Sequence, residues 1–273
     1  MHFYFQLTLI FFCFFINQTI FASKLISKYK VIEDRKRGKV VLFLHEKKLN
    51  QQWLWKRFSK NDAKYEGEIK DGLPHGMGTI NFEVGKWNGG KKYVGKWKHG
   101  KFHGKGKFSW NNGQEYEGEF KFGKKDGQGE LTLSNGSKYI GEFKLGNYHG
   151  KGTLIFGKEK GEKHRNTEKY EGYWFNGKFN GIGSYTYNHG DKYVGIFKDN
   201  KKHGHGKYNW LSGKEYVGEF ENDLIDGFGI LSKPDGSLFI GEYKDGLQWE
   251  GILYKKKSSL KLKVIKGIKS KIK

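Results

Sequence analysis

Residues 116–123 read Tyr-Glu-Gly-Glu-Phe-Lys-Phe-Gly, and residues 216–223 read Tyr-Val-Gly-Glu-Phe-Glu-Asn-Asp. The same start, with an aromatic residue first and a glycine at position three, occurs eight times along the chain. The eight copies begin at Tyr65, Tyr93, Tyr116, Tyr139, Tyr170, Tyr193, Tyr216 and Phe239. Five of the seven spacings are 23 residues, and the other two are 28 and 31. Self-similarity at such a period indicates a stacked array of one supersecondary unit.

Positions one, three and five of the repeat share one parity, so on a β-strand they face the same side. They hold tyrosine, glycine and usually a second ring, whereas the positions between them are mostly Glu, Lys or Val. We predict that these residues are structural and form a buried aromatic face, while the other face of the strand is wet. The residues of this pattern are Tyr65, Gly67, Tyr93, Gly95, Trp97, Tyr116, Gly118, Phe120, Tyr139, Gly141, Phe143, Tyr170, Gly172, Trp174, Tyr193, Gly195, Phe197, Tyr216, Gly218 and Phe220.

Position eight of the repeat is glycine in six copies and Asn200 or Asp223 in the other two. These are the residue types that best tolerate a left-handed backbone, so the pattern predicts a tight turn with positive φ. A second strand, Gly-x-Gly-x-apolar, follows the turn. The sequence therefore predicts an all-β fold, an elongated single-layer array of tandem β-hairpins. A lone hairpin is not stable, and stacking supplies its neighbours. We expect the eighth copy, residues 239–254, to be a C-terminal cap.

The pattern Tyr-x-Gly-x-(Trp/Phe)-x-x-Gly-x-x-(His/Asp/Asn)-Gly-x-Gly resembles the MORN repeat (membrane occupation and recognition nexus) over residues 65–254. The resemblance implies a scaffold that associates with membranes and binds protein partners. Similar arrays occur in membrane tethers and in ciliary and cytoskeletal scaffolds. They also precede some phosphatidylinositol-phosphate kinase and SET-type methyltransferase domains. The flanks of this array are too short for either catalytic domain, so we expect no enzyme activity and no cofactor.

The net charge of +22 is concentrated at the two flanks of the array. Residues 23–64 carry 13 Lys/Arg and 4 Asp/Glu, and residues 252–273 carry 9 Lys and no acid, so each flank is +9. Such flanks favour anionic partners. We expect the basic tail, residues 255–273, to contact anionic phospholipid, either as an amphipathic helix or as a solvated disordered segment. The predicted lipid-binding residues are Lys255, Lys256, Lys257, Lys261, Lys263 and Lys266.

Residues 1–22 carry no Lys, Arg, Asp or Glu and are largely apolar. They are interpreted as a signal anchor or as a cleaved signal peptide, and translation from a later start is a third interpretation. An anchor followed by many lysines predicts a membrane-associated protein with its repeats on the cytoplasmic side. Cleavage would instead place the array in the secretory pathway. Residues 23–64 are interpreted as a basic N-terminal cap, with a strand at Val40–Leu44 and a helix or strand at Leu49–Phe58.

Four histidines share one repeat position: His75, His103, His149 and His203. Asp or Asn occupies that position in other copies, which indicates turn chemistry. Equivalent residues of stacked hairpins lie roughly 10 Å apart, too far for one metal ion. We therefore predict neither a metal site nor a catalytic site. The aromatic residues are explained by the core, so we expect no nucleic-acid partner. The leading hypothesis is a membrane-associated scaffold, and this hypothesis is compatible with an oligomer. The alternatives are a cytoskeletal or ciliary structural component and an accessory subunit that places a lipid kinase or methyltransferase.

Overall fold

The computed structural model describes residues 32–34, 39–49, 52–56, 63–82, 90–157, 167–255 and 260–271, and these residues form strands and turns without a helix. The all-β prediction is therefore confirmed for the described residues. The apolar segment 1–22 lies outside them. The chain divides into two compact units: residues up to Gly113 with Phe120–Gly123 form the first, and Gln114–Glu119 with the residues from Lys124 onward form the second.

The strands of the first unit pair antiparallel with their neighbours. Strand β2 pairs with β1, β3 and β4, and the hairpins continue through β5, β6 and β7. The strand expected at Val40–Leu44 is part of β2, and the ambiguous segment at Leu49–Phe58 contains strand β3. The strands are β1 (Ile32–Asp34), β2 (Lys39–Leu49), β3 (Gln52–Lys56), β4 (Ala63–Lys70), β5 (Leu73–Asn81), β6 (Gly90–Lys98) and β7 (Lys101–Trp110).

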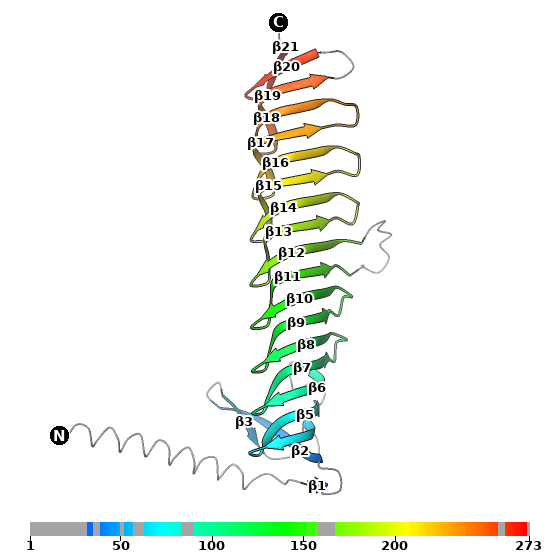
Figure 1. The fold of residues 1–273 in the computed structure, drawn as a ribbon, viewed down its shortest axis with the longest axis vertical. Coiled ribbons are helices and arrows are strands. Elements are labelled where there is room, and N and C mark those ends of the chain that lie inside the picture. The colour runs from blue at the N-terminus through cyan, green and yellow to red at the C-terminus, as the bar shows by residue number, and fades with distance from the viewer. Residues whose placement is uncertain are drawn as a thin grey trace, which may run out of the picture. The chain divides into compact units, whose positions relative to one another are not determined.

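In the second unit, each strand from β9 to β21 pairs antiparallel with the next, which gives a single-layer sheet (Figure 1). Strand β8 (Glu115–Lys121) is shared by the two units. The others are β9 (Lys124–Thr132), β10 (Lys138–Lys144), β11 (Asn147–Ile155), β12 (Lys169–Phe175), β13 (Lys178–Thr186), β14 (Lys192–Lys198), β15 (Lys201–Asn209), β16 (Glu215–Glu221), β17 (Leu224–Ser232), β18 (Leu238–Lys244), β19 (Leu247–Lys255), β20 (Leu260–Ile265) and β21 (Ile268–Lys271).

Each repeat tyrosine lies flat across a pair of glycines that face each other on adjacent strands. In the hairpin β10–β11, Gly141 is opposite Gly152, and a Cβ added to Gly152 would clash with the Tyr139 ring. The Tyr139 hydroxyl donates a hydrogen bond of 2.9 Å to the Glu142 carbonyl. All seven repeat tyrosines are 0% exposed and make the equivalent bond. Glycine is therefore required because any side chain would occupy the place of the ring.

Edge-to-face ring contacts join each repeat to the next within a unit. The Tyr139 ring contacts Phe143 of its own repeat at 5.1 Å and Trp174 of the following repeat at 5.2 Å, with interplanar angles of 83° and 89°. The same alternation continues from Tyr170 to Tyr243. Such pairs contribute about 0.5–1.5 kcal/mol each beyond burial. The core of the second unit is thus a ladder of rings on one face of the sheet.

The two-residue hairpin turns have positive φ at both positions, as in type I′ turns. At Leu145 and Gly146, φ is 52° and 97°. The Gly146 amide donates to the Lys125 carbonyl of the preceding repeat at 2.8 Å, so the turns of successive repeats are bonded together. Where Asn200 replaces the turn glycine, its side-chain oxygen also accepts a bond from Phe179 N at 2.7 Å. The predicted positive-φ turn is confirmed.

The C-terminal tail differs from both structures expected for it. Residues 260–271 form the hairpin β20–β21, and β20 pairs with β19. The expected helix is wrong because Leu262 and Val264 alternate with lysines at a period of two, and Val264 is buried at 1% exposure. The eighth repeat, β18–β19, is therefore followed by one more short hairpin and does not end the sheet.

Gly129→Ala is expected to destabilise the second unit. The added Cβ would lie 2.5 Å from the Tyr116 hydroxyl, so the ring must leave its place. We expect the free energy of unfolding to fall by about 1–3 kcal/mol, as for other overpacked cores. Urea unfolding followed by circular dichroism measures it. The control Gln128→Ala, on the exposed face of the same strand, should change it by less than about 0.5 kcal/mol. Equal effects of both substitutions would contradict the role of the glycine.

Leu145→Asn is expected to stabilise the fold. Leucine at φ 52° has its Cβ close to the following carbonyl, whereas asparagine tolerates this conformation. Leu145 is 63% exposed, so little apolar burial is lost. We expect a gain of about 1 kcal/mol. The reverse change Asn176→Leu, at the same place in the next turn, should cost a similar amount in the same urea experiment. Two changes of the same sign would overturn the strain argument.

Candidate functional site

The surface of the aromatic face, defined here as the side of the sheet that carries the repeat tyrosines, is formed by position ten of each repeat. In the second unit, Tyr148 stacks on Tyr139 at 3.8 Å, and Phe179 stacks on Tyr170 at 3.8 Å. Both upper rings are half-buried, whereas the tyrosines beneath them are fully covered. A partner on this face would therefore touch position ten and not the repeat tyrosines.

Lysine replaces the ring at position ten in two repeats of the second unit. The Lys125 ammonium lies 5.5 Å from the Tyr116 ring centroid and 5.2 Å from that of Phe143. Burial lowers the pKa of the Lys125 amine because it removes water from the charged form. No carboxylate pairs with Lys125 in the part of the chain that the structure describes. Its charge is held by ring faces alone, which suits it to an anionic group of a partner.

The second lysine, Lys202, is at the equivalent position of strand β15 and lies among tyrosines. Its ammonium is 5.8 Å from the Tyr187 ring and 5.7 Å from the Tyr208 ring, and 3.4 Å from an Asp223 carboxylate oxygen. The ring of Trp210 packs on Tyr208 at 4.5 Å. These half-exposed rings and the paired amine form the most polar part of the aromatic face.

Asp191 is a buried carboxylate beside this cluster, but its contacts are those of a turn anchor. It accepts bonds from the Tyr208 hydroxyl at 2.8 Å and from Leu211 N at 2.9 Å, and it lies 3.2 Å from the His189 ring. Burial favours the neutral acid, but the bonds from Leu211, Tyr208 and His189 outweigh it and lower the pKa of Asp191. Ser137 has an equivalent role in an earlier linking turn, where it accepts a bond from Gly157 N. Asp191 is therefore a structural residue.

The histidines of the shared repeat position lie beside the turn of the following repeat. The His75 ring contacts His99 at 5.5 Å, and the His149 ring contacts Phe175 at 5.4 Å. His203 pairs with Glu221 at 2.9 Å. Among the described residues, no group of three or more His, Cys, Asp or Glu side chains could hold a metal ion. These contacts agree with the turn role that the sequence indicated.

The predicted lipid-binding lysines lie at the end of the second unit. Lys261 and Lys263 project from β20, and Lys266 lies in the following turn with a φ of 48°. All three are exposed. Lys255 ends β19 and is exposed, whereas Lys256 and Lys257 lie outside the described residues. The structure thus brings Lys261, Lys263 and Lys266 together on one hairpin and not along one side of a helix.

The sequence reasoning missed the position-ten row, which includes Lys125, Tyr148, Phe179 and Lys202. The available signal was their place two residues after the turn residue of each repeat. No helix in the described ranges is long and apolar enough to cross a membrane. The residues predicted to form the repeat pattern are in contact with one another in the core, as their burial requires.

One of the solved structures that resemble this chain has a low TM-score. The TCP domain of SAS-4 (dCPAP) of Drosophila melanogaster, solved in complex with a proline-rich motif of Ana2 (dSTIL), is similar with a TM-score of 0.35 and 9% identity. The match covers 62% of this chain and 84% of that chain. No curated protein matches the sequence.

The family model for the MORN repeat matches more than half of the chain. It covers seven of the eight predicted copies, and the eighth folds as the hairpin β18–β19 with Gly241 opposite Gly251. The matched residues are 65–87, 93–115, 116–138, 139–158, 170–192, 193–214 and 216–238. With its paired glycines, covered tyrosines and bonded turns, the chain belongs to the MORN repeat family.

Proposed function

We propose that this chain is a non-catalytic scaffold that associates with anionic phospholipid membranes and binds protein partners through its array. MORN repeat proteins are in general non-catalytic and take part in membrane and protein interactions. Two features of this chain support the finer proposal. One is the concentration of positive charge outside the array, and the other is the half-exposed surface of the aromatic face.

The observation that carries the membrane proposal is the hairpin β20–β21. Its lysines are Lys261, Lys263, Lys266, Lys269 and Lys271, and all five are exposed. No acid occurs in residues 252–273, and these lysines have no ion pair among the described residues. Lysines near an anionic membrane contribute about 1 kcal/mol each, within a Debye length of the surface. A rigid hairpin presents them together without the entropy cost of ordering a tail.

The proposed location is the cytoplasmic side of a membrane. Lys24, Lys28 and Lys30 follow the apolar segment 1–22, and basic residues that flank such a segment favour the cytoplasmic side. If the segment is cleaved, the alternative is the secretory pathway. N-terminal sequencing of the native protein distinguishes a chain that starts near Ser23 from one with the segment retained.

The protein-binding part of the proposal rests on the aromatic face. Tyr148 and Phe179 offer flat apolar area, while Lys125 offers a charge without a carboxylate partner. Rings and cations are the residue types that anchor protein interfaces. The same surface also fits a structural component of a cytoskeletal or ciliary assembly, which is the second candidate function. It also serves an accessory subunit that places a separate phosphatidylinositol-phosphate kinase or SET-type methyltransferase.

Substituting glutamine for all five lysines of β20–β21 is expected to abolish most binding to phosphatidylserine-containing vesicles. At about 1 kcal/mol for each lysine, the apparent affinity should fall by more than tenfold at moderate salt. Liposome flotation measures it. The matched control replaces the same five residues with arginine, which keeps the charge and should keep the binding. If wild-type protein does not float, the lipid part of the proposal fails.

Replacing Tyr187 and Trp210 with serine is expected to remove protein neighbours in the native cell. Both rings are half-exposed on the aromatic face, so their loss should not unfold the core. Proximity labelling compares this variant with a control in which Ile182 and Phe228, 66% and 54% exposed on the opposite face, become serine. Neighbours lost only in the control would place the partner site on the opposite face. Cytoskeletal neighbours that persist without a membrane pool would favour the second candidate function.

A further inference from the structure

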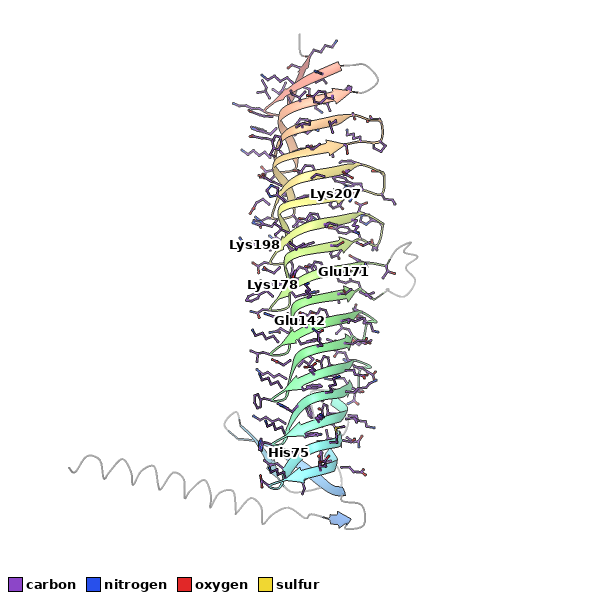
Figure 2. The ribbon with its side chains drawn as sticks, viewed as in Figure 1. His75, Glu142, Glu171, Lys178, Lys198 and Lys207 are labelled. Carbon is purple, nitrogen blue, oxygen red and sulfur yellow. The ribbon has the colours of Figure 1, made fainter. Side chains whose placement is uncertain are left out.

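The hairpin turns of the second unit form a row along one edge of the sheet, which we name the tip row. It comprises residues 144–147, 175–178, 198–201, 221–224, 244–247 and 265–268. The turns are in line because each turn amide bonds to the preceding repeat, as at Gly177 N to Tyr148 O, 2.9 Å. Figure 2 shows Lys178 and Lys198 at this edge and Lys207 toward the other side.

The side chains that flank each turn are almost entirely lysine or large apolar residues. Each tip has one such pair on opposite strands, and ten of the twelve positions are Lys, Leu, Ile or Phe. All twelve are exposed. The pairs are Lys144–Asn147, Phe175–Lys178, Lys198–Lys201, Glu221–Leu224, Lys244–Leu247 and Ile265–Ile268.

The linking turns at the opposite edge have a different chemistry. Those described throughout in the second unit are built mainly from Asn, Ser, Asp and Gly, and the exceptions are His189, Leu211, Lys214 and Pro234. They occupy residues 134–137, 188–191, 211–214 and 234–237. The side chains that flank the tips are all exposed, whereas most of those that flank the linking turns are half-buried, among them Leu133, Tyr187 and Trp210.

Two features of the tips lower stability without any compensation inside the fold. Leu145 occupies a left-handed position at φ 52°, where the other turns of the unit use mostly Asn or Asp. Lys198 and Lys201 are directly opposite each other, and like charges in that position repel. Neither of these lysines has an ion pair among the described residues. An external surface that supplies negative charge relieves the repulsion between the lysines, and one that takes the Leu145 side chain offsets the cost of its backbone conformation.

Two of the four acidic residues of the tip row, Asp199 and Asp223, pair with a lysine, and Glu221 contacts a histidine. Asp199 pairs with Lys178 at 3.0 Å, Glu221 with His203 at 2.9 Å, and Asp223 with Lys202 at 3.4 Å. The charges left without a partner in the fold are therefore mainly those of lysines. This charge and the protruding Leu, Ile and Phe side chains match the two parts of an anionic lipid interface.

We infer that the tip row is the edge of the array that contacts an anionic phospholipid bilayer. This inference rests on the proposed membrane association and adds which surface makes it. The apolar side chains stand singly on separate tips. A lipid interface can take them without a complementary pocket, whereas a protein partner would have to provide one for each. The lysines beside them lie at the level of the headgroups. The aromatic face then remains free for a protein partner.

The test places one fluorescent reporter on each edge of the full chain. Cysteine is introduced at Asn147 in a tip or at Ser134 in a linking turn, in a background where the single natural cysteine, Cys13, is serine. An environment-sensitive dye is attached. We expect its emission to rise and shift to the blue for the tip reporter on phosphatidylserine-containing vesicles, and brominated acyl chains to quench it. The linking-turn reporter should not respond.

A charge-matched pair of variants tests the lysines. Lys198→Gln with Lys201→Gln should weaken flotation by about tenfold or more. Lys192→Gln with Lys233→Gln, which removes two exposed lysines beside linking turns, should change it by less than about twofold. Absence of any vesicle binding by the wild-type chain would refute the membrane function. Binding with a silent tip reporter, or equal loss in both variants, would refute the tip row alone.

Discussion

The contact between a tyrosine ring and two opposed glycines is the constraint on which the rest of the structure depends. Each ring covers the glycine pair, and its hydroxyl donates to a backbone carbonyl of its own strand, as Tyr170 does to Tyr173. A single-layer sheet has no second layer to cover its core. The rings provide that cover themselves, because each tyrosine lies against the position-five ring of the following repeat. The hairpin and the stack are therefore stabilised by the same side chain.

Because the repeat residues form the core, binding must depend on residues at other positions. The tyrosines are inaccessible, and burial raises the pKa of Tyr139 and its equivalents, so their hydroxyls stay protonated donors at physiological pH. A partner can reach only side chains outside the repeat pattern. These are position ten on the aromatic face, the flanks of the turns and the terminal hairpin. They are also where the repeats differ most, as Tyr148 and Lys202 illustrate at one equivalent position.

The repeat period, the parity of the rings and the left-handed turns could be predicted from sequence because each depends on local chemistry. The terminal hairpin could not. Leu260, Val264 and Ile268 fit a helical period, while Leu262 and Val264 also fit a strand, and only pairing with β19 decides between them. The position-ten row was missed for a related reason. The hairpins of seven repeats contain an irregularity, as between Gly141 and Glu142, so simple alternation does not say which residue after the turn covers the tyrosine.

The turns show how a repeat fold separates stability from binding. Asn200 and Asp223 fit the left-handed backbone and also return a hydrogen bond to the preceding repeat, so they represent the chemistry that stability alone would select. The side chains of Leu145 at the first turn position and of the opposed lysines Lys198 and Lys201 contribute no such bond among the described residues, although the Leu145 amide donates to Asp126. In a fold whose core is held by rings and glycines, the side chains of such tips lie exposed outside the core. Residues that are unfavourable for the hairpin can therefore occur in the tip row. The tip row is also the edge at which a flat bilayer surface would contact the array.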